Sequence, residues 1–546
     1  MSQSPSPAPS APALSATPAP AMTRREVLEA LSGILLGVFV SLLATTIVST
    51  SLPKIVSELG GSQHSYTWVV TAMLLTMTIS TPLWGKLADL TNRKVLMQVA
   101  LGITVVSAAA AGLSQNIEML IGFRALQGIG AGGLTALATV LMSDIISPRE
   151  RGKYMGLMGG VMAVAQIGGP LLGGVLTDSV GWRFTFFVGV PFAVAAFIVL
   201  QKTLHLPALA KRTVKIDYAG AGLIAVAVAL LLLWVTFAGD QFEWLSWQTA
   251  AMVGGAVLAL VIVGFVEKAA AEPIIPLHLF KNRTFVLAVI ASASVGVAMF
   301  GTAVFLSQYF QLARGKTPTE SGLLTIPMVV GTMLAGIVLG RIISNTGRYK
   351  AIMVGGAVVL TASLFGLSTI EVDTSFVVIS VFLFGLGLSV GALMQNLVLA
   401  TQNTLDVHEM GAGTSGVAFF RSLGGAIGVS ALGAVMASKI QDDLATGLAK
   451  LGIASDAMGA GSGAVPDLAS LPAPVQTVVE SAYSDGITTI FLYAVPMAVI
   501  SLIAVLFIKE IPLGQRSGIE QALAEEKAGE EKAGEQAVAA PVAERA

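Results

Sequence analysis

The chain carries the stretch Gly85-Lys86-Leu87-Ala88-Asp89-Leu90-Thr91-Asn92-Arg93-Lys94 between two apolar segments. A glycine lets two helices approach closely, and an acid and a base at this spacing can clamp neighbouring helix ends. The same layout returns at Gly340-Arg341-Ile342-Ile343-Ser344-Asn345-Thr346-Gly347-Arg348. Gly340 follows Gly85, and Arg348 follows Arg93, by the same number of residues. One such turn alone would be an ordinary basic loop, but its repetition indicates two homologous halves.

The composition around these turns is that of a membrane protein. Of the 546 residues, 54% are hydrophobic and 12% are charged, and the mean hydropathy is +0.81. A soluble domain carries about 25% charged residues. Crossing ~30 Å of hydrocarbon takes about 20 helical residues, and fourteen apolar segments are long enough. These spans are predicted near residues 30–53, 65–87, 95–114, 117–143, 154–177, 183–203, 218–239, 248–267, 285–311, 320–343, 351–370, 375–402, 411–438 and 484–508.

The spans divide the chain into consecutive parts, and the two copies of the turn are eight spans apart. Two bundles of six helices with two inserted spans fit this arrangement. The predicted parts are a disordered tail (1–26), an N-terminal six-helix bundle (27–203), a linker with two extra transmembrane helices (204–270), a C-terminal six-helix bundle (271–510) that includes an outer loop (439–483), and a second tail (511–546).

Basic residues cluster at one set of span ends. Lysine and arginine beside a span stay in the cytoplasm, and an even number of spans puts both termini on one side. Both termini are therefore predicted to be cytoplasmic, with the protein in the cell membrane. The basic clusters are Arg24/Arg25, Arg93/Lys94, Arg149/Arg151/Lys153, Lys211/Arg212/Lys215, Lys281/Arg283 and Arg348/Lys350.

Several classes of function are disfavoured. The chain has no cysteine, and its four histidines are predicted to lie in loops, so a zinc site inside the membrane has no ligand set. No cofactor and no metal are expected. The formal net charge is −1, which gives no field to attract nucleic acid. A membrane enzyme would need His, Asp or Glu clustered at depth, and the spans show no such cluster.

Four further segments carry motifs in order along the spans: Arg124-Ala125-Leu126-Gln127-Gly128-Ile129-Gly130-Ala131-Gly132, Gly168-Gly169-Pro170-Leu171-Leu172-Gly173-Gly174, Trp182-Arg183-Phe184-Thr185-Phe186-Phe187-Val188-Gly189-Val190-Pro191 and Phe420-Arg421-Ser422-Leu423-Gly424-Gly425-Ala426-Ile427-Gly428. Together with the first turn, they make residues 25–510 similar to the major facilitator superfamily, and specifically to its fourteen-span drug:proton antiporters. The resemblance implies a substrate site between the halves and alternating access by rocking of one half against the other.

The resemblance also points to residues for coupling and gating. Arg124, with Gln127 on the same helix face, matches a motif linked to proton coupling, and Arg421 is a second arginine inside a span. A cation at such depth is a functional hypothesis by default, whereas snorkelling to the interface is the alternative. The turns add three candidates for a latch: Asp89, Arg93 and Arg348.

The motif in the fifth span resembles that of exporters within the superfamily. Gly169 and Gly173 form a small-residue face for tight packing, and Pro170 permits bending of the helix. Packing alone would explain the glycines. The pattern with proline favours export over uptake.

The first span departs from the resemblance. Fourteen-span relatives commonly carry aspartate where this chain has Ala44, and asparagine where it has Ser49. Alanine cannot carry a proton, so proton antiport would have to use acids nearer the span ends. The candidate carriers are Glu118, Asp144, Glu320 and Asp485, with Asp89 as a further acid on the inner side.

A cavity for bulky apolar molecules is expected between the halves. Flexible methionines, aromatic rings and neutral amides suit ligands of varied shape, although each such residue singly is more often packing or lipid-facing. The candidates are Met73, Gln166, Gln308, Gln311, Met394, Gln395, Asn396 and Phe420.

The expected function is secondary active export of hydrophobic or amphiphilic small molecules, as in multidrug or antibiotic efflux, driven by proton entry. The alternative is export of one lipid-like or self-made metabolite with different or weak proton coupling. A receptor or scaffold would leave the repeated turn and the exporter motif unexplained. The expected partners are the hydrophobic substrate, protons and the lipid bilayer, and a monomer is expected.

Overall fold

The computed structural model of the chain describes residues 24–61, 63–146, 148–203, 217–238, 242–269, 273, 276–405, 409–453 and 472–513. Within these ranges the regular structure is helical and no strand is named, which confirms the predicted all-α class. The predicted tails, apart from a few residues at their inner ends, and residues 454–471 of the predicted outer loop lie outside the described residues.

The first half begins at Arg24 and ends at Thr203. Asparagine residues start two of its helices: Asn92 and Asn116 each accept hydrogen bonds from backbone amides of the following turn. The helices are α1 (Arg24–Glu58), α2 (Gln63–Leu90), α3 (Arg93–Gly112), α4 (Ile117–Ile145), α5 (Pro148–Ser179), the short α6 (Arg183–Phe187) and α7 (Gly189–Thr203).

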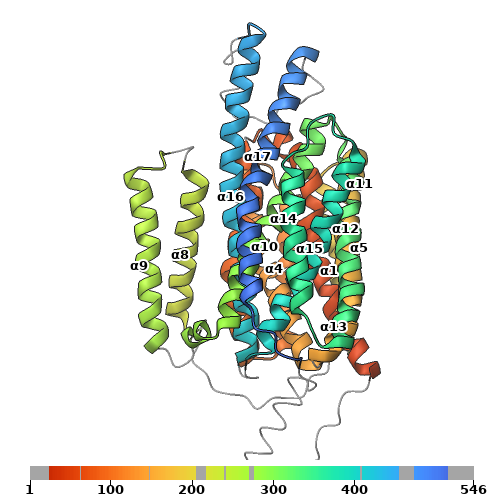
Figure 1. Cartoon of the computed structure of the whole chain (residues 1–546), viewed down its shortest axis with the longest axis vertical. Coiled ribbons are helices and arrows are strands. Elements are labelled where there is room, and N and C mark those ends of the chain that lie inside the picture. Colours follow the sequence, from red (N-terminus) through yellow and green to blue (C-terminus); the bar gives the residue numbers. More distant parts are fainter. Residues whose placement is uncertain are drawn as a thin grey trace, which may run out of the picture.

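A pair of helices follows, α8 (Tyr218–Phe237) and α9 (Trp247–Ala269), packed against each other. Figure 1 shows this pair standing beside the main bundle. Helix α8 contacts α2 and α16, whereas α9 is largely exposed, as apolar helices facing lipid are. These two helices correspond to the predicted extra spans.

The second half contains the remaining helices. Two of its spans include a π-helical turn, and Thr325 interrupts the second of them. The elements are η1 (Leu277–Lys281), α10 (Arg283–Gln308), η2 (Tyr309–Ala313), α11 (Pro318–Leu324), α12 (Ile326–Leu334), η3 (Ala335–Leu339), α13 (Gly340–Thr346), α14 (Lys350–Leu367), α15 (Phe376–Gln402), α16 (Met410–Lys450) and α17 (Ala473–Phe507).

Among the described residues, twelve helices are long and apolar enough to cross a membrane. Helix α5, of 32 residues, and the apolar helical segment 219–235 within α8 are not among the twelve. The predicted total of fourteen spans therefore stays a prediction.

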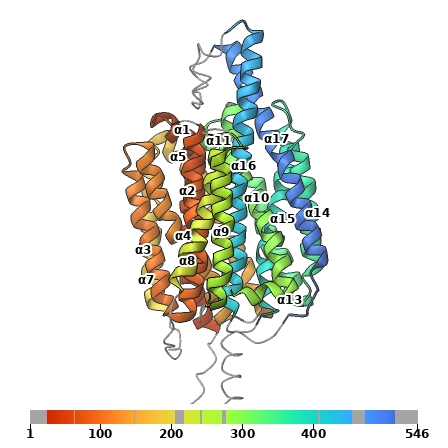
Figure 2. The same ribbon diagram turned by 90° about the vertical axis from the view of Figure 1, so that its left-hand side faces the viewer.

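The two halves lie side by side (Figure 2), and their helices touch towards both ends of the bundle. The two ends are named here by residues that they carry, the Arg93 end and the Glu118 end. Towards the Glu118 end, Tyr66 of α2 donates to the Val304 carbonyl at 3.3 Å, and Gln311 Nε2 donates to the Thr50 carbonyl at 3.2 Å.

Towards the Arg93 end, Gly85 of α2 lies against Ser415 of α16, so closely that a Cβ at Gly85 would be 2.4 Å from Ser415 Oγ. Helix α5 also contacts α13 there. Because the halves meet towards both ends, the structure represents a closed conformation.

The prediction of an outer loop over residues 439–483 is wrong in its extent. Helix α16 continues to Lys450 and α17 already begins at Ala473, and the two project together from the bundle (Figure 1). Apolar residues at helical spacing explain the extension, because Leu448 of α16 and Val475 and Val479 of α17 are buried in one hydrophobic cluster. Most of the connection between these two helices lies outside the described residues.

Candidate functional site

A cavity of about 40 Å³ lies between the two halves. Helices α1, α4 and α5 line it from the first half, and α15 and α16 from the second. Its wall is apolar apart from four hydroxyl side chains, one amide and one guanidinium. The lining residues are Val38, Ser41, Leu42, Thr135, Ala138, Thr139, Met158, Met394, Gln395, Val398, Thr414, Ala418 and Arg421.

Arg421 is the charged residue of this central cavity. It is 5% exposed and lies roughly 16 Å along α16 from Met410, which is half the thickness of a bilayer core. Helix α10 packs against the backbone at this point, because a Cβ at Gly296 would lie 2.1 Å from the Arg421 carbonyl oxygen. The side chain instead reaches the cavity. Its guanidinium makes no hydrogen bond or ion pair with any residue that the structure describes.

Arg124 of α4 is buried as well, at 2% exposure, but it is bonded to neutral groups. Its Nη1 donates to Gln127 Oε1 at 2.8 Å and to the Ala44 carbonyl at 3.3 Å, and its Nε donates to the Val69 carbonyl at 3.4 Å. The guanidinium thereby ties α4 to α1 and α2. Arg124 and Gln127, which were predicted to share a helix face, are directly bonded.

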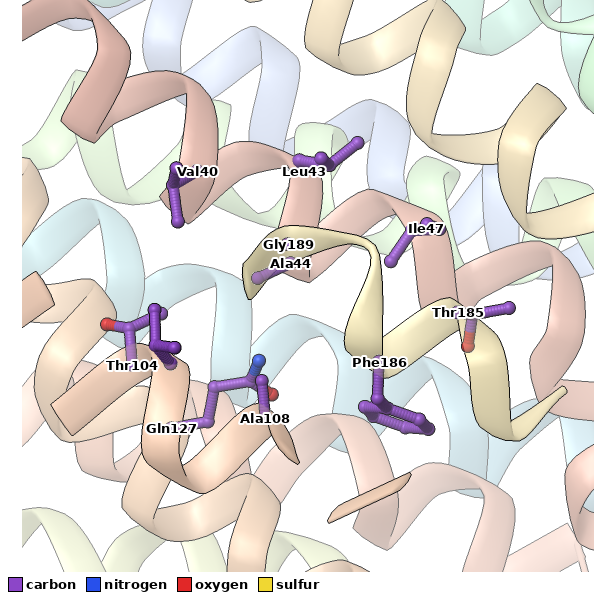
Figure 3. Close-up of a pocket in the computed structure, with 11 residues that line it drawn as sticks. Val40, Leu43, Ala44, Ile47, Thr104, Ala108, Gln127, Thr185, Phe186 and Gly189 are labelled. Carbon is purple, nitrogen blue, oxygen red and sulfur yellow. The ribbon is translucent and has the colours of Figure 1, made fainter. Parts of the chain in front are cut away.

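A second, smaller pocket of about 10 Å³ lies within the first half. Figure 3 shows Ala44, Gln127, Phe186 and Gly189 around it. The position at which relatives are expected to carry aspartate is thus a methyl group at the wall of this pocket. Neither of the two pockets has a carboxylate in its described lining.

The predicted exporter motif fixes α5 against α1. A Cβ at Gly169 would lie 2.1 Å from Thr46 Oγ1, and one at Gly173 would lie 2.2 Å from a carbonyl oxygen of α1. Thr50 Oγ1 donates to the Pro170 carbonyl at 3.1 Å. The two glycines therefore allow a contact between backbones, as small-residue faces do in membranes.

The same motif meets the second half across the interface. A Cβ at Gly322 of α11 would lie 2.9 Å from the Pro170 carbonyl oxygen, and one at Gly174 would lie 2.7 Å from the Thr319 backbone. Thr319 Oγ1 also donates to Asp178 Oδ2 at 2.6 Å. The motif therefore sits where α1, α5 and α11 come together.

The first turn forms a clamp between helix ends. Arg93 at the start of α3 makes an ion pair with Asp144 near the end of α4, and its Nε donates to the Ala88 carbonyl at 2.8 Å. Both partners belong to the first half. Asp89 lies in the last turn of α2, and its side chain is outside what the structure describes.

Asn92 of the first turn does not adopt a left-handed conformation. Asn92 has φ −68° and ψ 107°, and its Oδ1 accepts hydrogen bonds from the amides of Lys94 and Val95 as the cap of α3. The equivalent position in the second copy, Gly347, does adopt a positive φ of 69°. A side-chain cap has taken the place of a glycine bend in the first half.

The second turn is held differently. Arg348 is exposed, and Glu510 beyond α17 accepts hydrogen bonds from the backbone amides of Tyr349 and Lys350 at 3.0 and 3.2 Å. The repeat therefore preserves the turn but not its ion pair.

The candidate proton carriers lie away from both pockets. Glu118 and Asp485 are exposed, and Glu320 is an exposed member of a capping box with Thr317 at the start of α11. Asp144 makes an ion pair with Arg93. The structure brings none of these four acids together with another.

The predicted substrate residues separate into groups. Met394 and Gln395 line the central cavity. Met73 packs with Met77 and Ala131 in a small buried cluster of its own. The others lie elsewhere: Gln311 bonds to Thr50 and Ser307, Asn396 donates to the Ala392 carbonyl of its own helix, Phe420 packs on Phe280 and Phe419, Gln308 is fully buried, and Gln166 is half-buried in α5.

Several cavity residues were not predicted, among them Ser41, Thr135, Thr139 and Met158. Small hydroxyl residues are common along every span of this chain, so the sequence gives no signal that separates those facing the cavity. Only the packing of α1 and α4 against the second half selects them.

Comparison with known proteins agrees with this architecture. MFS-type transporter Rv1877 of Mycobacterium tuberculosis is 35% identical over 491 residues, covering 88% of this chain and 69% of that protein. Multidrug transporter protein MdtP of Bacillus subtilis is 35% identical over 406 residues, covering 74% of each chain.

Among solved structures, a bacterial homologue of the human lysosomal transporter Spinster, in an inward-facing unoccupied conformation, has the same fold. It superposes with a TM-score of 0.59 at 14% identity, covering 89% of this chain and 98% of that one. A family model described as Major Facilitator Superfamily matches residues 34–429. With its two helical halves and the cavity between them, this chain is a membrane transporter that belongs to the major facilitator superfamily.

Proposed function

We propose that this transporter exports hydrophobic or amphiphilic small molecules by alternating access, with proton entry as the driving force. The central cavity carries the proposal, because it is mainly apolar and both halves contribute to its wall. A ligand at such an interface is exposed to one side and then to the other as the halves rock. The cavity of the closed conformation would widen as either end opens.

Two further observations support drug export. The exporter motif of α5 contacts both α1 and α11, so it can transmit motion of the second half to the first. Relatives include Multidrug transporter protein MdtP of Bacillus subtilis and Efflux pump dotC of Dothistroma septosporum, which is 31% identical over 509 residues. Antibiotics and other amphiphilic drugs are the class of substrate that these names suggest.

For coupling, we assign gating to the charged residues of the turns and to the two buried arginines. Arg93 with Asp144 would stiffen the Arg93 end, and Arg124 with Gln127 would link α4 to α1. The full set comprises Asp89, Arg93, Arg124, Gln127, Arg348 and Arg421, and proton carriage is assigned to Glu118, Asp144, Glu320 and Asp485. The protein would work as a monomer in the cell membrane, with fourteen spans and both termini in the cytoplasm.

A second candidate is export of one lipid-like or self-made metabolite with weak or different proton coupling. The observation that favours it is the acid-free lining of both described pockets. A site without a carboxylate cannot exchange a proton directly for the substrate.

The experiment that tests both candidates uses purified protein in liposomes, a panel of dyes and an imposed pH gradient. Proton antiport predicts dye movement that follows the gradient and proton movement that follows the dye. The same proton flux is then measured in Glu118→Gln, Asp144→Asn, Glu320→Gln and Asp485→Asn. Dye movement without any proton flux in the parent protein would contradict antiport and favour the second candidate.

A further inference from the structure

The central cavity contains a cation that the described part of the protein leaves without an anionic partner. Arg421 is 5% exposed and lies roughly 16 Å along α16 from its first residue, and its guanidinium offers five N–H donors. Burying a charge is unfavourable unless it is paired and hydrogen-bonded. Asp and Glu are absent from the described lining of the cavity, so the partner would have to come from elsewhere.

The rest of the polar lining adds two side chains whose donors are free of described partners, the Gln395 amide of α15 and the Ser41 hydroxyl of α1. The Gln395 amide lines the cavity from α15 and makes no hydrogen bond with a described residue. The hydroxyls of Thr135 and Thr139 already donate to carbonyls of their own helix, at 2.9 and 2.7 Å. The second half therefore contributes the guanidinium and the amide, while the first half contributes the Ser41 hydroxyl and mainly apolar surface.

The second buried arginine adds positive charge to the interior without a described counter-charge. Arg124 is bonded to Gln127 and to two backbone carbonyls, and no acid is among these partners. Since the candidate acids lie at the bundle ends, the described surroundings of the two buried arginines carry an excess of positive charge. Low dielectric strengthens the attraction of such a site for an anion.

We propose that the central cavity binds the anionic group of an amphiphile, namely a carboxylate, sulfonate or phosphate attached to an apolar body. Arg421 binds the anionic group and Gln395 donates a further hydrogen bond. The volume of about 40 Å³ in the closed conformation accommodates only the head of such a ligand, so the apolar body requires the wider cavity of an open conformation. This inference rests on the proposed function in one respect, that the cavity is the transport site.

The test uses two probes that share one scaffold and differ in charge. They are 8-anilinonaphthalene-1-sulfonate and its uncharged counterpart N-phenyl-1-naphthylamine. Equilibrium binding is measured by fluorescence to the full chain in phosphatidylcholine nanodiscs, with empty nanodiscs as the blank and gluconate as the background anion. We expect the sulfonate to bind at least about tenfold more tightly than the neutral probe, as a hydrogen-bonded charge contact provides.

The variants locate the site. Arg421→Gln is expected to remove the preference for the sulfonate and to leave the neutral probe within about twofold, whereas Arg421→Lys, which keeps the charge, retains most of it. Arg341→Gln, at an exposed arginine of α13, is the matched control and should bind as the parent does. If Arg421→Gln does not fold, the proposal is tested by the preference of the parent protein for the sulfonate and by the preference that Arg421→Lys retains.

Some outcomes of these binding measurements would overturn the proposal, and others would identify the source of the anion. Equal or weaker binding of the sulfonate in the parent, or an unchanged preference in Arg421→Gln, would overturn it. Displacement of the sulfonate by a few millimolar chloride at constant ionic strength would assign the cavity to an inorganic anion and would overturn it too. Loss of the Arg421-dependent binding in nanodiscs with phosphatidylglycerol would identify a lipid headgroup as the source of the anion. Retention of that binding would identify a soluble amphiphile as the source.

Transport in liposomes separates this proposal from the proposed function. Movement of neither probe, with the binding preference intact, would contradict export and leave the anion site standing. Movement of the neutral probe without a binding preference would contradict the anion site alone.

Discussion

Replacing Gly85 by alanine should open the Arg93 end of the transporter. In the closed conformation the new Cβ would lie 2.4 Å from Ser415 Oγ and 2.5 Å from Ser415 Cβ. A rotation of the serine can move Oγ but not Cβ, so α2 and α16 must separate. Overpacking of this kind typically costs about 1–3 kcal/mol.

The overpacking destabilises only the closed conformation. Once the Arg93 end has opened, the contact between α2 and α16 no longer exists, and alanine fits there without a clash. A difference of about 1–3 kcal/mol between two states changes their ratio about 5- to 150-fold. Gly85→Ala should therefore increase the population open at the Arg93 end by at least about fivefold.

Thiol accessibility measures this population. The chain has no cysteine, so Ser41→Cys in the wall of the central cavity introduces a single thiol. A membrane-impermeant maleimide added from the Arg93 side should label it at least about fivefold faster in the Gly85→Ala background. The control is Gly102→Ala, because a Cβ there meets nothing within 4 Å.

A second substitution tests the mechanism. Ser415→Gly removes the two atoms that would clash with the new Cβ, so Gly85→Ala with Ser415→Gly should return the labelling rate towards that of the control. Equal labelling in Gly85→Ala and Gly102→Ala would refute the reasoning, as would an acceleration that Ser415→Gly fails to reverse.

Three further predictions follow from the first half. Arg93→Gln and Asp144→Asn should each lower the free energy of unfolding, measured in detergent, by about 1.5–3 kcal/mol. The double variant should lose less than the sum of the two single losses. Additive losses would mean that the ion pair contributes nothing to stability. Gly173→Ala should strongly impair dye efflux because Gly173 lies in close contact with α1. Gly168→Ala is the control, since a Cβ there meets nothing within 4 Å, and should not impair efflux. Equal efflux rates in the two variants would contradict the role of the contact with α1. Asn92→Ala should cost about 0.5–2 kcal/mol as a lost helix cap, and thermal unfolding that shows no loss would count against the cap.

How much of the fold the sequence predicted can be judged from particular elements. The spans followed from apolar length alone, since a helix must satisfy its backbone polar groups within the membrane and needs a fixed number of residues to cross it. The span predicted over 183–203 agrees with α6 and α7, and the one over 375–402 agrees with α15 to within one residue. The error at 439–483 arose because the projecting ends of α16 and α17 combine a few buried apolar residues with many polar ones, so that mean hydropathy does not reveal these helix ends.

The sequence by itself identified this chain as a helical membrane protein with many spans and predicted two related halves, and the family match confirms the superfamily that its motifs predicted. These properties depend on composition, on repetition and on local patterns, all of which can be read along the chain. The tertiary structure decided which groups face one another. Arg93 and Arg348 occupy equivalent turns, yet only the first makes a described ion pair, because Asp144 lies beside it in space. Likewise, Arg421 faces a cavity rather than a carboxylate, since five helices from distant parts of the chain determine what surrounds it.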